Sequence, residues 1–567
     1  MSKDENKIKL KDHWFWGSIY ENKATYVQIA LASIFINFFG LGSSFYIMTV
    51  YDRVMPNNAY NSLIALTIGM VIVIIFDFIM KLLRAYFIDK TGQQLEQTVN
   101  SDIFKKILSH DTEFLNKSQG VAATVREFEG IRDFFTSASM VAFIDLPFMF
   151  LFLGIIYMIA GPLAIVPILI VPIVLGVAAL TQPLLKRFSQ RHLTSQQGKT
   201  TILHELLNNV ETVRTIAGGK FLHDKWNSSV EEQSKAGTTS RAISNFAVTF
   251  SQTGLQASQA AIVCFGVVLV GKLEITSGAL IACVILSGRI LSPLVQAGQL
   301  LTRLNHSLVA YSKIDDLMSI KTRDEITQEY KATNINNGEI LVKNVSFKVD
   351  ETKILENINF SIKDGEKVGI VGNIGSGKTT LLRSLIGFHL PTEGIINLGG
   401  YDIQNIPAQE FRSYVGYCPQ KVQLFTGTVY ENITAGFENV SEEEVIKSAT
   451  LACSHDFIAK LPGGYNYELK NSGSNLSGGQ RQAIALTRSL IRKPKVLVLD
   501  EPTSSMDSNT ELQIINNIMS LDYNPTIVIS THRTNHLIRT DKIGILVDGK
   551  LATYGPREDI LKQEKSD

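Results

Sequence analysis

The sequence has almost no net charge and few cysteines, and each shortage excludes a class of protein. Its 54 lysine and arginine residues nearly balance 53 aspartates and glutamates, which leaves a formal net charge of +1. Without an excess of basic residues there is no field to attract a polyanion, so nucleic acid is not expected as a partner. The four cysteines, Cys264, Cys283, Cys418 and Cys453, show neither CxxC nor close Cys/His spacing. This argues against a zinc site or a disulfide framework.

The N-terminus lacks the features of a signal peptide. Its first 24 residues are polar, with no short apolar core followed by a cleavage site. The stretch DHWFWGSIY places Trp14, Phe15, Trp16 and Tyr20 just before the first apolar run. Aromatic residues at that position are typical of a membrane interface. A soluble helix that packs its aromatic side chains inward is the alternative.

Long apolar runs dominate the first 300 residues. Six of them reach the ~20 residues that a membrane-spanning helix needs. These predicted spans are residues 26–50, 63–83, 139–160, 162–180, 246–270 and 279–301. The connections 84–138 and 181–245 are long, charged and rich in Lys and Arg, whereas the short connections carry only Arg53 and Lys272. The positive-inside rule therefore predicts that the long connections and both termini are cytoplasmic, with the helices continuing beyond the membrane.

One charged residue falls in the middle of a predicted span. Arg289 lies in the sixth span, with Pro293 close behind it. A charge at the bilayer centre costs ~2.5–3.5 kcal/mol on insertion scales, so we expect Arg289 to face a translocation path or a buried ion pair. Asp77 and Asp145 are candidate partners. The alternative is an arginine that reaches the interface from a shifted span.

The spacing of apolar residues changes after residues 318–340, a polar, charged segment that is typical of a linker. Apolar runs such as KVGIVG, SLIGF, VLVLD and TIVIST then alternate with helical stretches. Such alternation indicates a parallel sheet with crossover helices. The predicted domains are an N-terminal segment (1–24), a transmembrane domain (25–317), a linker (318–337) and a nucleotide-binding domain (338–567).

A glycine-rich loop, VGIVGNIGSGKTTLL, lies between a predicted strand and a predicted helix. It matches GxxxxGK[ST], in which glycines let backbone N–H groups approach phosphate oxygens at a helix N-terminus. Lys378 would neutralise the β- and γ-phosphates, and the Thr379 hydroxyl would ligate Mg²⁺. A structural glycine turn is the alternative. The predicted nucleotide-binding residues here are Gly372, Asn373, Ile374, Gly375, Ser376, Gly377, Lys378, Thr379 and Thr380.

The segment KVLVLDEPTSSMD delivers two carboxylates to the end of a buried strand. Asp500 suits Mg²⁺ through water, and Glu501 can take a proton from an attacking water. A capped or solvated turn is the alternative for this pair on its own. The segment VISTHR ends another predicted strand at His532.

A second glycine-rich loop, SNLSGGQRQ, opens a later helix. Its Ser477 hydroxyl, the bare N–H groups of Gly478 and Gly479, and the helix N-terminus all favour an anion. A simple serine N-cap is the local alternative.

Taken in order, GNIGSGKTT, YCPQ, LSGGQ, LVLDEP, SSMD and His532 resemble the ATP-binding cassette of ABC transporters, over about residues 338–563. The six preceding spans resemble the exporter-type membrane domain. The resemblance implies a multidomain fold, an all-α six-helix transmembrane domain followed by an α/β P-loop nucleotide-binding domain that hydrolyses ATP. It also implies coupling helices near residues 110–115 and 205–213.

Further roles follow from the resemblance alone. His532 would contact the γ-phosphate and act with Glu501 and Lys378 in catalysis, and Thr379, Gln420 and Asp500 would hold Mg²⁺. The loop at Ser477 would contact ATP bound by the other cassette, so two chains would form a homodimer with twelve spans and two composite sites. The residues that this adds to the ATP site are Gln420, Ser477, Gly478, Gly479, Gln480 and Asp507.

Motifs in the membrane half resemble one group within the ABC transporters. FYIMTVYDRVMPNNAYNSLIALTIG, REFEGIRDFFTSA, IDLPF, GPLAIVPILIVP and LSGRILSPL look like type I secretion ATPases of the bacterial inner membrane. These export RTX-type toxins, proteases and large adhesins, unfolded, through a periplasmic adaptor and an outer-membrane channel. DHWFWGSI most resembles the adhesin-exporting branch, which often has an N-terminal peptidase-like domain. No cysteine precedes Cys264, so we expect no cysteine protease in this chain.

Two positions depart from the family pattern, and the cargo stays open. The aromatic residue that stacks on adenine is replaced by Val349, with Tyr330 a candidate substitute, and an acidic position before the signature is Asn471. The alternatives to polypeptide export are an exporter of lipid, drug or short peptide, and an ABC ATPase that gates a channel or regulates another complex. The last is disfavoured because every hydrolytic residue is present.

Overall fold

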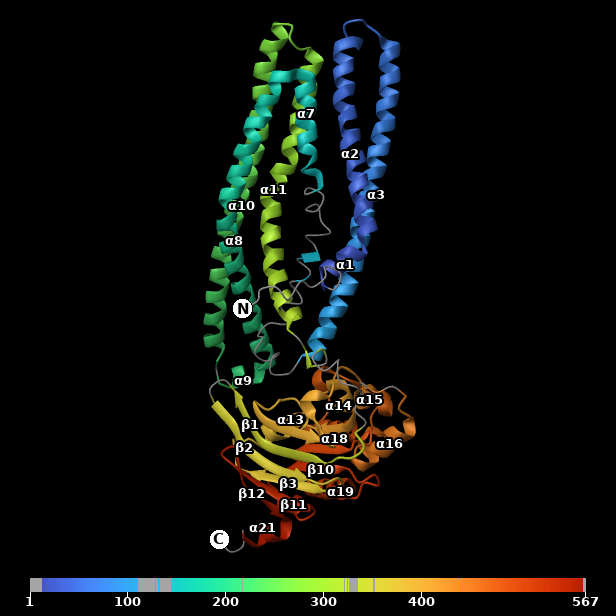
Figure 1. Ribbon diagram of the computed structural model, residues 1–567, viewed down its shortest axis with the longest axis vertical. Helices are drawn as coiled ribbons and strands as arrows, with labels where there is room; N and C mark the ends of the chain where they lie inside the picture. Colours follow the sequence, from blue (N-terminus) through green and yellow to red (C-terminus); the bar gives the residue numbers. More distant parts are fainter. Residues whose placement is uncertain are drawn as a thin grey trace. The chain divides into compact units, whose positions relative to one another are not determined.

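Backbone contacts divide the chain into two compact units (Figure 1), a helical unit that ends at Ile320 and a second unit that contains the sheets. The structure is a computed structural model. It describes residues 13–110, 128, 131–132, 144–216, 218–320, 322–323, 325, 335–349, 352–435, 437 and 439–563. The division falls inside the segment that the sequence predicts as a linker.

The helical unit is built around very long helices. Its described elements are α1 (Trp16–Glu21), α2 (Lys23–Thr49), the π-helix η1 (Val50–Val54), α3 (Tyr60–Ser109), α7 (Phe148–Ala160), the 3₁₀ turn η2 (Gly161–Ala164), α8 (Ile165–Asn208), α9 (Val210–Thr215), α10 (Gly219–Gly271) and α11 (Ser277–Ser319). α8 packs along α10, and α11 packs against α10, α8, α7 and α2. At about 1.5 Å per residue, α3, α8, α10 and α11 each exceed the ~30 Å of a bilayer core, so any that crosses a membrane also extends beyond it.

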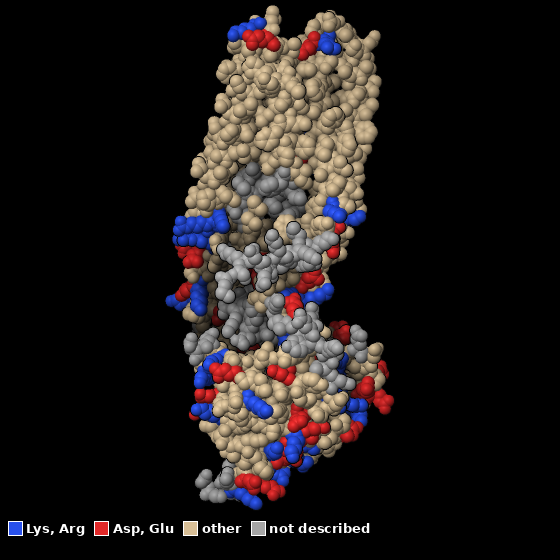
Figure 2. Space-filling view, viewed as in Figure 1, with Lys and Arg blue, Asp and Glu red and all other residues tan. Residues whose placement is uncertain are grey.

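Five described helical segments are long and apolar enough to cross a membrane: Lys23–Val54, Tyr60–Ser109, Phe148–Asn208, Gly219–Gly271 and Ser277–Val295. The segment Phe148–Asn208 contains both α7 and α8, which η2 separates, so it holds the described parts of the third and fourth predicted spans. On the face drawn in Figure 2, the helical unit has a broad band with almost no charged residues, with Lys, Arg, Asp and Glu gathered beyond it. The chain is therefore a multi-pass membrane protein.

α8 and α10 lie side by side but differ in proline content. α8 contains Pro172 and Pro183 within its helical span, whereas α10 runs for 53 residues without a proline. Their close approach depends on glycine, because a Cβ on Gly254 of α10 would lie 3.0 Å from Val174 Cγ2 of α8. At this point the backbone of α10 therefore packs directly against a side chain of α8.

One carboxylate joins two of the short connections. Asp52 in η1 accepts hydrogen bonds from the Thr276 hydroxyl at 2.5 Å and the Gly278 N–H at 2.8 Å. Thr276 is also the N-cap of α11, with its hydroxyl accepting from the Ala279 N–H at 3.1 Å. The negative charge of Asp52 thus lies at the positive N-terminal end of α11, where the helix dipole favours it.

The N-terminal aromatic residues divide between the two settings considered for them. Phe15 is buried, and Trp14 stacks on Tyr311 of α11 and donates its indole N–H to Asp315 at 2.9 Å. Trp16 and Tyr20 remain exposed. The stretch therefore anchors its first aromatic residues on α11 and presents the later ones outward.

The second unit combines a parallel and an antiparallel sheet. The larger sheet has the order β12-β11-β3-β10-β9-β6, parallel except for the β11–β12 pair. Its strands are β3 (Lys367–Gly372), β6 (Val415–Cys418), β9 (Val496–Asp500), β10 (Thr526–Ser530), β11 (Lys542–Val547) and β12 (Lys550–Pro556). The antiparallel sheet has the order β2-β1-β4-β5, from β1 (Ile340–Val349), β2 (Thr352–Ile362), β4 (Glu393–Leu398) and β5 (Tyr401–Asp402), and β7 (Gly427–Thr428) pairs with β8 (Glu468–Leu469).

Helices cover both faces of the parallel sheet, which explains why its central strands are apolar throughout. Val498 and Val528 point into a core shared with α13 and the antiparallel sheet, while Leu497 and Ile527 point into a core shared with α18 and α19. The helices of this unit are α13 (Lys378–Leu385), α14 (Ala408–Tyr414), α15 (Val429–Thr434), α16 (Glu442–Leu451), α17 (His455–Ile458), α18 (Gly478–Leu490), α19 (Ser508–Met519), α20 (Thr534–Leu537) and α21 (Arg557–Gln563). Strands buried on both faces read as continuous apolar runs, as the sequence shows.

One apolar run is misplaced by the sequence. SLIGF, residues 384–388, belongs to the end of α13 and the turn after it rather than to a strand. α13 ends at Leu385, inside this run, and Gly387, at φ +69°, lies in the turn that follows. The runs KVGIVG, VLVLD and TIVIST are β3, β9 and β10, and they lie side by side.

Candidate active site

The P-loop connects β3 to α13. Gly375 and Gly377 have φ values of +84° and +99°, in the region that favours glycine. A Cβ on Gly377 would lie 2.9 Å from Leu355 Cδ2 and 3.1 Å from the Ile354 carbonyl oxygen. Lys378 begins α13 and folds back over the loop, donating from Nζ to the carbonyl oxygens of Gly372 at 2.6 Å and Asn373 at 3.0 Å. The loop thus presents a lysine and a helix N-terminus together, which is an anion-binding arrangement.

Asp500 ends β9 in a buried position. Its Oδ1 accepts a hydrogen bond from the Ser530 hydroxyl at 2.6 Å, and its Oδ2 has no hydrogen-bond partner among the described residues. Burial raises the pKa of neighbouring Tyr417 and Cys418 to about 12, with the charge of Asp500 contributing, so both stay uncharged. A buried carboxylate oxygen without a partner fits a divalent cation or its water, so Asp500 suits the Mg²⁺ that the sequence predicts.

Glu501 is held by two other predicted site residues. Its Oε2 accepts a hydrogen bond from Gln420 Nε2 at 2.8 Å, and its Oε1 lies 2.7 Å from His532 Nε2. Glu501 has a φ of +47°, which is unusual for a residue with a side chain. Gln420, Glu501 and His532 follow β6, β9 and β10, whose C-terminal ends meet at one edge of the sheet.

The second glycine-rich loop forms the start of α18. The Ser477 hydroxyl accepts from the Gln480 N–H at 3.2 Å, and the Gln480 side chain accepts from the Ser477 N–H at 2.9 Å, so the pair forms a capping box. In the described residues no hydrogen bond joins this loop to the P-loop of the same chain. The serine N-cap is therefore present, and the predicted contact with nucleotide stays a prediction.

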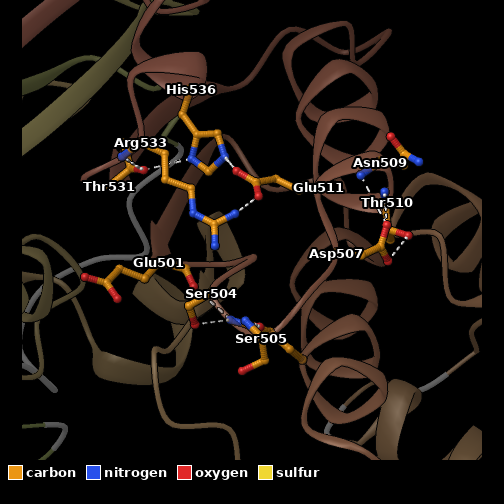
Figure 3. Close-up of polar contacts among 11 residues, drawn as sticks. Glu501, Ser504, Ser505, Asp507, Asn509, Thr510, Glu511, Thr531, Arg533 and His536 are labelled. Atoms are coloured by element: carbon orange, nitrogen blue, oxygen red, sulfur yellow. Dashed lines mark hydrogen bonds and ion pairs between the residues drawn. The ribbon is translucent and has the colours of Figure 1, made fainter.

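Asp507 caps the next helix, α19. It accepts from the Asn509 and Thr510 backbone N–H groups at 3.1 and 3.0 Å and from the Thr510 hydroxyl at 2.7 Å (Figure 3). The hydrogen bonds from Thr510 lower the pKa of Asp507. Its carboxylate is thus kept ionised at the N-terminus of α19.

Gln482 is a structural link that the sequence analysis missed. This side chain in α18 is buried and donates to the Glu501 carbonyl oxygen at 2.8 Å and the Ser504 hydroxyl at 3.3 Å. It also accepts from the Ser505 N–H at 3.0 Å. Gln482 therefore joins the start of α18 to the segment between Glu501 and Asp507. A buried amide within the apolar run that follows SGGQR was the available signal.

The residues named for adenine binding are only partly described. Val349 ends β1, pairs with Thr352 and packs half-buried on the core of the unit. Tyr330 and the side chain of Asn471 lie outside the described residues. Of the predicted coupling helices, 110–115 is described only at residue 110, and 205–213 comprises the end of α8 and most of α9.

In the helical unit, the carboxylates suggested for Arg289 have other partners. Asp77 bonds Lys81 at 2.6 Å, one helical turn away. Asp145 lies 3.3 Å from Arg84 and accepts from Asn37 at 2.9 Å. The Arg289 guanidinium instead lies against Gly40 of α2, and neither carboxylate bonds it. Among the described residues no hydrogen bond or ion pair to Arg289 is formed, although the charge of Asp77 acts on its guanidinium.

Comparison with known proteins finds matches in both halves of the chain. A family profile described as "ABC transporter transmembrane region" matches residues 27–294, and one described as "ABC transporter" matches residues 355–504. The exotoxin translocation ATP-binding protein PaxB of Pasteurella aerogenes is 28% identical over 559 residues, covering 97% of this chain and 78% of PaxB. The alpha-hemolysin translocation ATP-binding protein HlyB of Escherichia coli is 28% identical over 561 residues, covering 98% and 78%. The leukotoxin export ATP-binding protein LtxB of Aggregatibacter actinomycetemcomitans is 28% identical over 568 residues, covering 99% and 80%.

A solved structure has a similar fold. A bacterial Atm1-family ABC exporter with ATP bound superposes with a TM-score of 0.86 at 22% identity, covering 96% of both chains. At that identity the likeness concerns the fold alone. It agrees with the predicted all-α membrane domain followed by an α/β P-loop domain.

Proposed function

Because the chain belongs to the ABC transporter family, with a membrane region followed by an ATP-binding domain, we propose that it exports an unfolded polypeptide as the ATPase of a type I secretion system. The observation that carries this proposal is similarity to toxin translocation proteins over 97–99% of the chain. An ATP-binding cassette alone does not distinguish one cargo from another. The similarity also extends through the membrane half, and it therefore supports a polypeptide such as an RTX-type toxin, protease or adhesin.

The roles proposed for the site residues combine the family resemblance with their positions. Lys378 and the N-terminus of α13 bind the phosphates of ATP. Glu501 accepts a proton from the attacking water, with Gln420 and His532 fixing the direction of its carboxylate. His532 donates toward the γ-phosphate from its exposed ring. Asp500, Thr379 and Gln420 would hold Mg²⁺, which would neutralise developing charge on the phosphates.

A complete site needs two chains. One chain has one P-loop and one SGGQ loop, and no described hydrogen bond joins them. In a head-to-tail homodimer, Ser477, Gly478 and Gly479 of one cassette face the ATP held by the other. This gives two identical composite sites, with Asp507 at the same interface.

The cellular setting follows from the proposed system. The membrane is the bacterial inner membrane, with both chain termini cytoplasmic. A periplasmic adaptor and an outer-membrane channel continue the path, and lipid surrounds the spans.

The test measures ATP turnover by the full chain in lipid nanodiscs with added cargo candidates. We expect a C-terminal RTX fragment to stimulate ATPase activity, and a scrambled peptide of equal composition to have no effect. Stimulation by lipid, drug or short peptide instead would assign the alternative cargo class. ATPase activity that none of them changes, in a chain that copurifies with a channel, would favour a regulatory role and refute export.

A further inference from the structure

The residues on both sides of His532 belong to a closed ring of hydrogen bonds. The Arg533 backbone N–H donates to the Thr531 hydroxyl oxygen at 3.0 Å, and this hydroxyl donates to His536 Nδ1 at 2.8 Å. His536 Nε2 bonds the Glu511 carboxylate, and that carboxylate also pairs with the Arg533 guanidinium. The ring therefore closes at Arg533, whose backbone N–H bonds Thr531 and whose guanidinium pairs with Glu511 (Figure 3).

Three members of the ring are buried, whereas the side chain of the fourth, Arg533, is 42% exposed, as is much of the flanked residue His532. Thr531, His536 and Glu511 are all less than 5% exposed, whereas the His532 side chain is 57% exposed and reaches Glu501. Hydrogen bonds to the buried Thr531, His536 and Glu511 side chains restrain the backbone of residues 531 and 533. The imidazole between them thus projects from a fixed base.

Both nitrogens of His536 have complementary partners when the ring is neutral. Nδ1 accepts from the Thr531 hydroxyl and Nε2–H donates to Glu511. Burial and the nearby Arg533 charge lower the pKa of His536 to about 4, so the imidazole is neutral at physiological pH. The single charge of Arg533 then balances that of Glu511.

The far side of the ring belongs to α19. Glu511 lies one turn after Asp507, the N-cap of that helix, and accepts bonds from both His536 and Arg533. A shift of the start of α19 would therefore move Glu511 and, through the ring, the backbone on either side of His532.

We propose that Thr531, Arg533, His536 and Glu511 are positioning residues, which hold His532 against Glu501 and link it to the start of α19. The inference rests on the proposed function, in which His532 and Glu501 act in ATP hydrolysis. None of the four touches the reacting groups. Their effect passes through His532, and this distinguishes the ring from a merely structural cluster.

The test compares ATP turnover by the full chain in nanodiscs carrying His536→Leu, His536→Gln and His532→Ala. We expect His536→Leu to lower kcat by about ten- to a hundredfold, because small displacements of a catalytic group have effects of that order, and to leave KM for ATP nearly unchanged. His536→Gln restores most of the rate, because an amide can donate to Glu511 and accept from Thr531. Thr531→Val, a near-isosteric change, tests the same ring if His536→Leu fails to fold.

The decisive measurement combines two changes. In a chain that already carries His532→Ala, we expect His536→Leu to cause no further loss of kcat. Losses that multiply, or a normal kcat for both His536→Leu and Thr531→Val, overturn the inference. His455→Leu is the matched control, since His455 bonds Tyr465 elsewhere in the same unit, and we expect it to keep wild-type kcat. Normal turnover by His532→Ala alone would instead remove His532 from the proposed site.

Discussion

Acidification is expected to destabilise the fold around His536. The folded-state pKa of about 4 lies below the ordinary value of 6.5, so between these values the unfolded chain binds a proton that the folded chain does not. Stability from this group is therefore complete above about pH 6.5 and is lost as the pH falls toward 4. Linkage gives a loss of about 2 kcal/mol between pH 7.5 and pH 5.

The assay is hydrogen–deuterium exchange of the full chain in detergent without nucleotide, at pH 7.5 and pH 5. It follows the amides of β10, which directly precede the ring, and corrects for intrinsic exchange rates. His536→Gln has no imidazole to titrate and is the reference. We expect the wild type to lose about 2 kcal/mol more protection than His536→Gln over this range. An equal loss in both proteins would show that His536 already binds a proton in the folded state.

Three further changes test other parts of the chain. Glu501→Gln keeps the size and hydrogen-bonding reach of the side chain but removes the base. We therefore expect intact ATP binding, a kcat lower by about a hundredfold or more and two cassettes that crosslink as a stable pair. Near-normal hydrolysis would place the base elsewhere. Arg289→Ala is expected to impair secretion while nucleotide binding stays normal, and normal secretion would remove Arg289 from the transport path. In wild type we expect near-equal dissociation constants for ATP and GTP. In Val349→Tyr we expect the dissociation constant for ATP to fall by roughly one to two decades, because the new ring can stack on adenine. A strong ATP preference in wild type that the new tyrosine does not change would mean that another group holds the base.

The parallel sheet and the P-loop were predictable because their signals are local. An apolar run that is buried on both faces indicates a strand such as β9, and the glycine spacing of the P-loop indicates its turn and helix. Gln420, Glu501 and His532 meet because parallel strands bring their C-terminal ends to one edge, a rule that needs no side-chain detail. The sequence itself placed Glu501 and His532 at strand ends, whereas Gln420 and the role of His532 came from the family resemblance.

Contacts that depend on side-chain choice among distant residues were not predictable. Glu511 and His536 are 25 positions apart, and nothing in either neighbourhood indicates that they meet. Asp77 was suggested as a partner for Arg289, and its charge acts on that arginine, but its hydrogen bond goes to Lys81, one turn away on the same helix. The Asp77–Lys81 pair was predictable from its i, i+4 spacing on a helix. The run at 384–388 was misassigned because short apolar segments suit a helix end as well as a strand.

The unequal prolines of α8 and α10 have a mechanical consequence. A proline inside a helix removes one backbone hydrogen bond and disrupts the packing of the preceding turn, which makes a preferred point of bending. α8 has two such points, at Pro172 and Pro183, and α10 beside it has none over 53 residues. α8 therefore has preferred points of bending, and α10 beside it has none of this kind. Bending of this pair is therefore expected in α8 near Pro172, close to the contact of Val174 with Gly254 of α10.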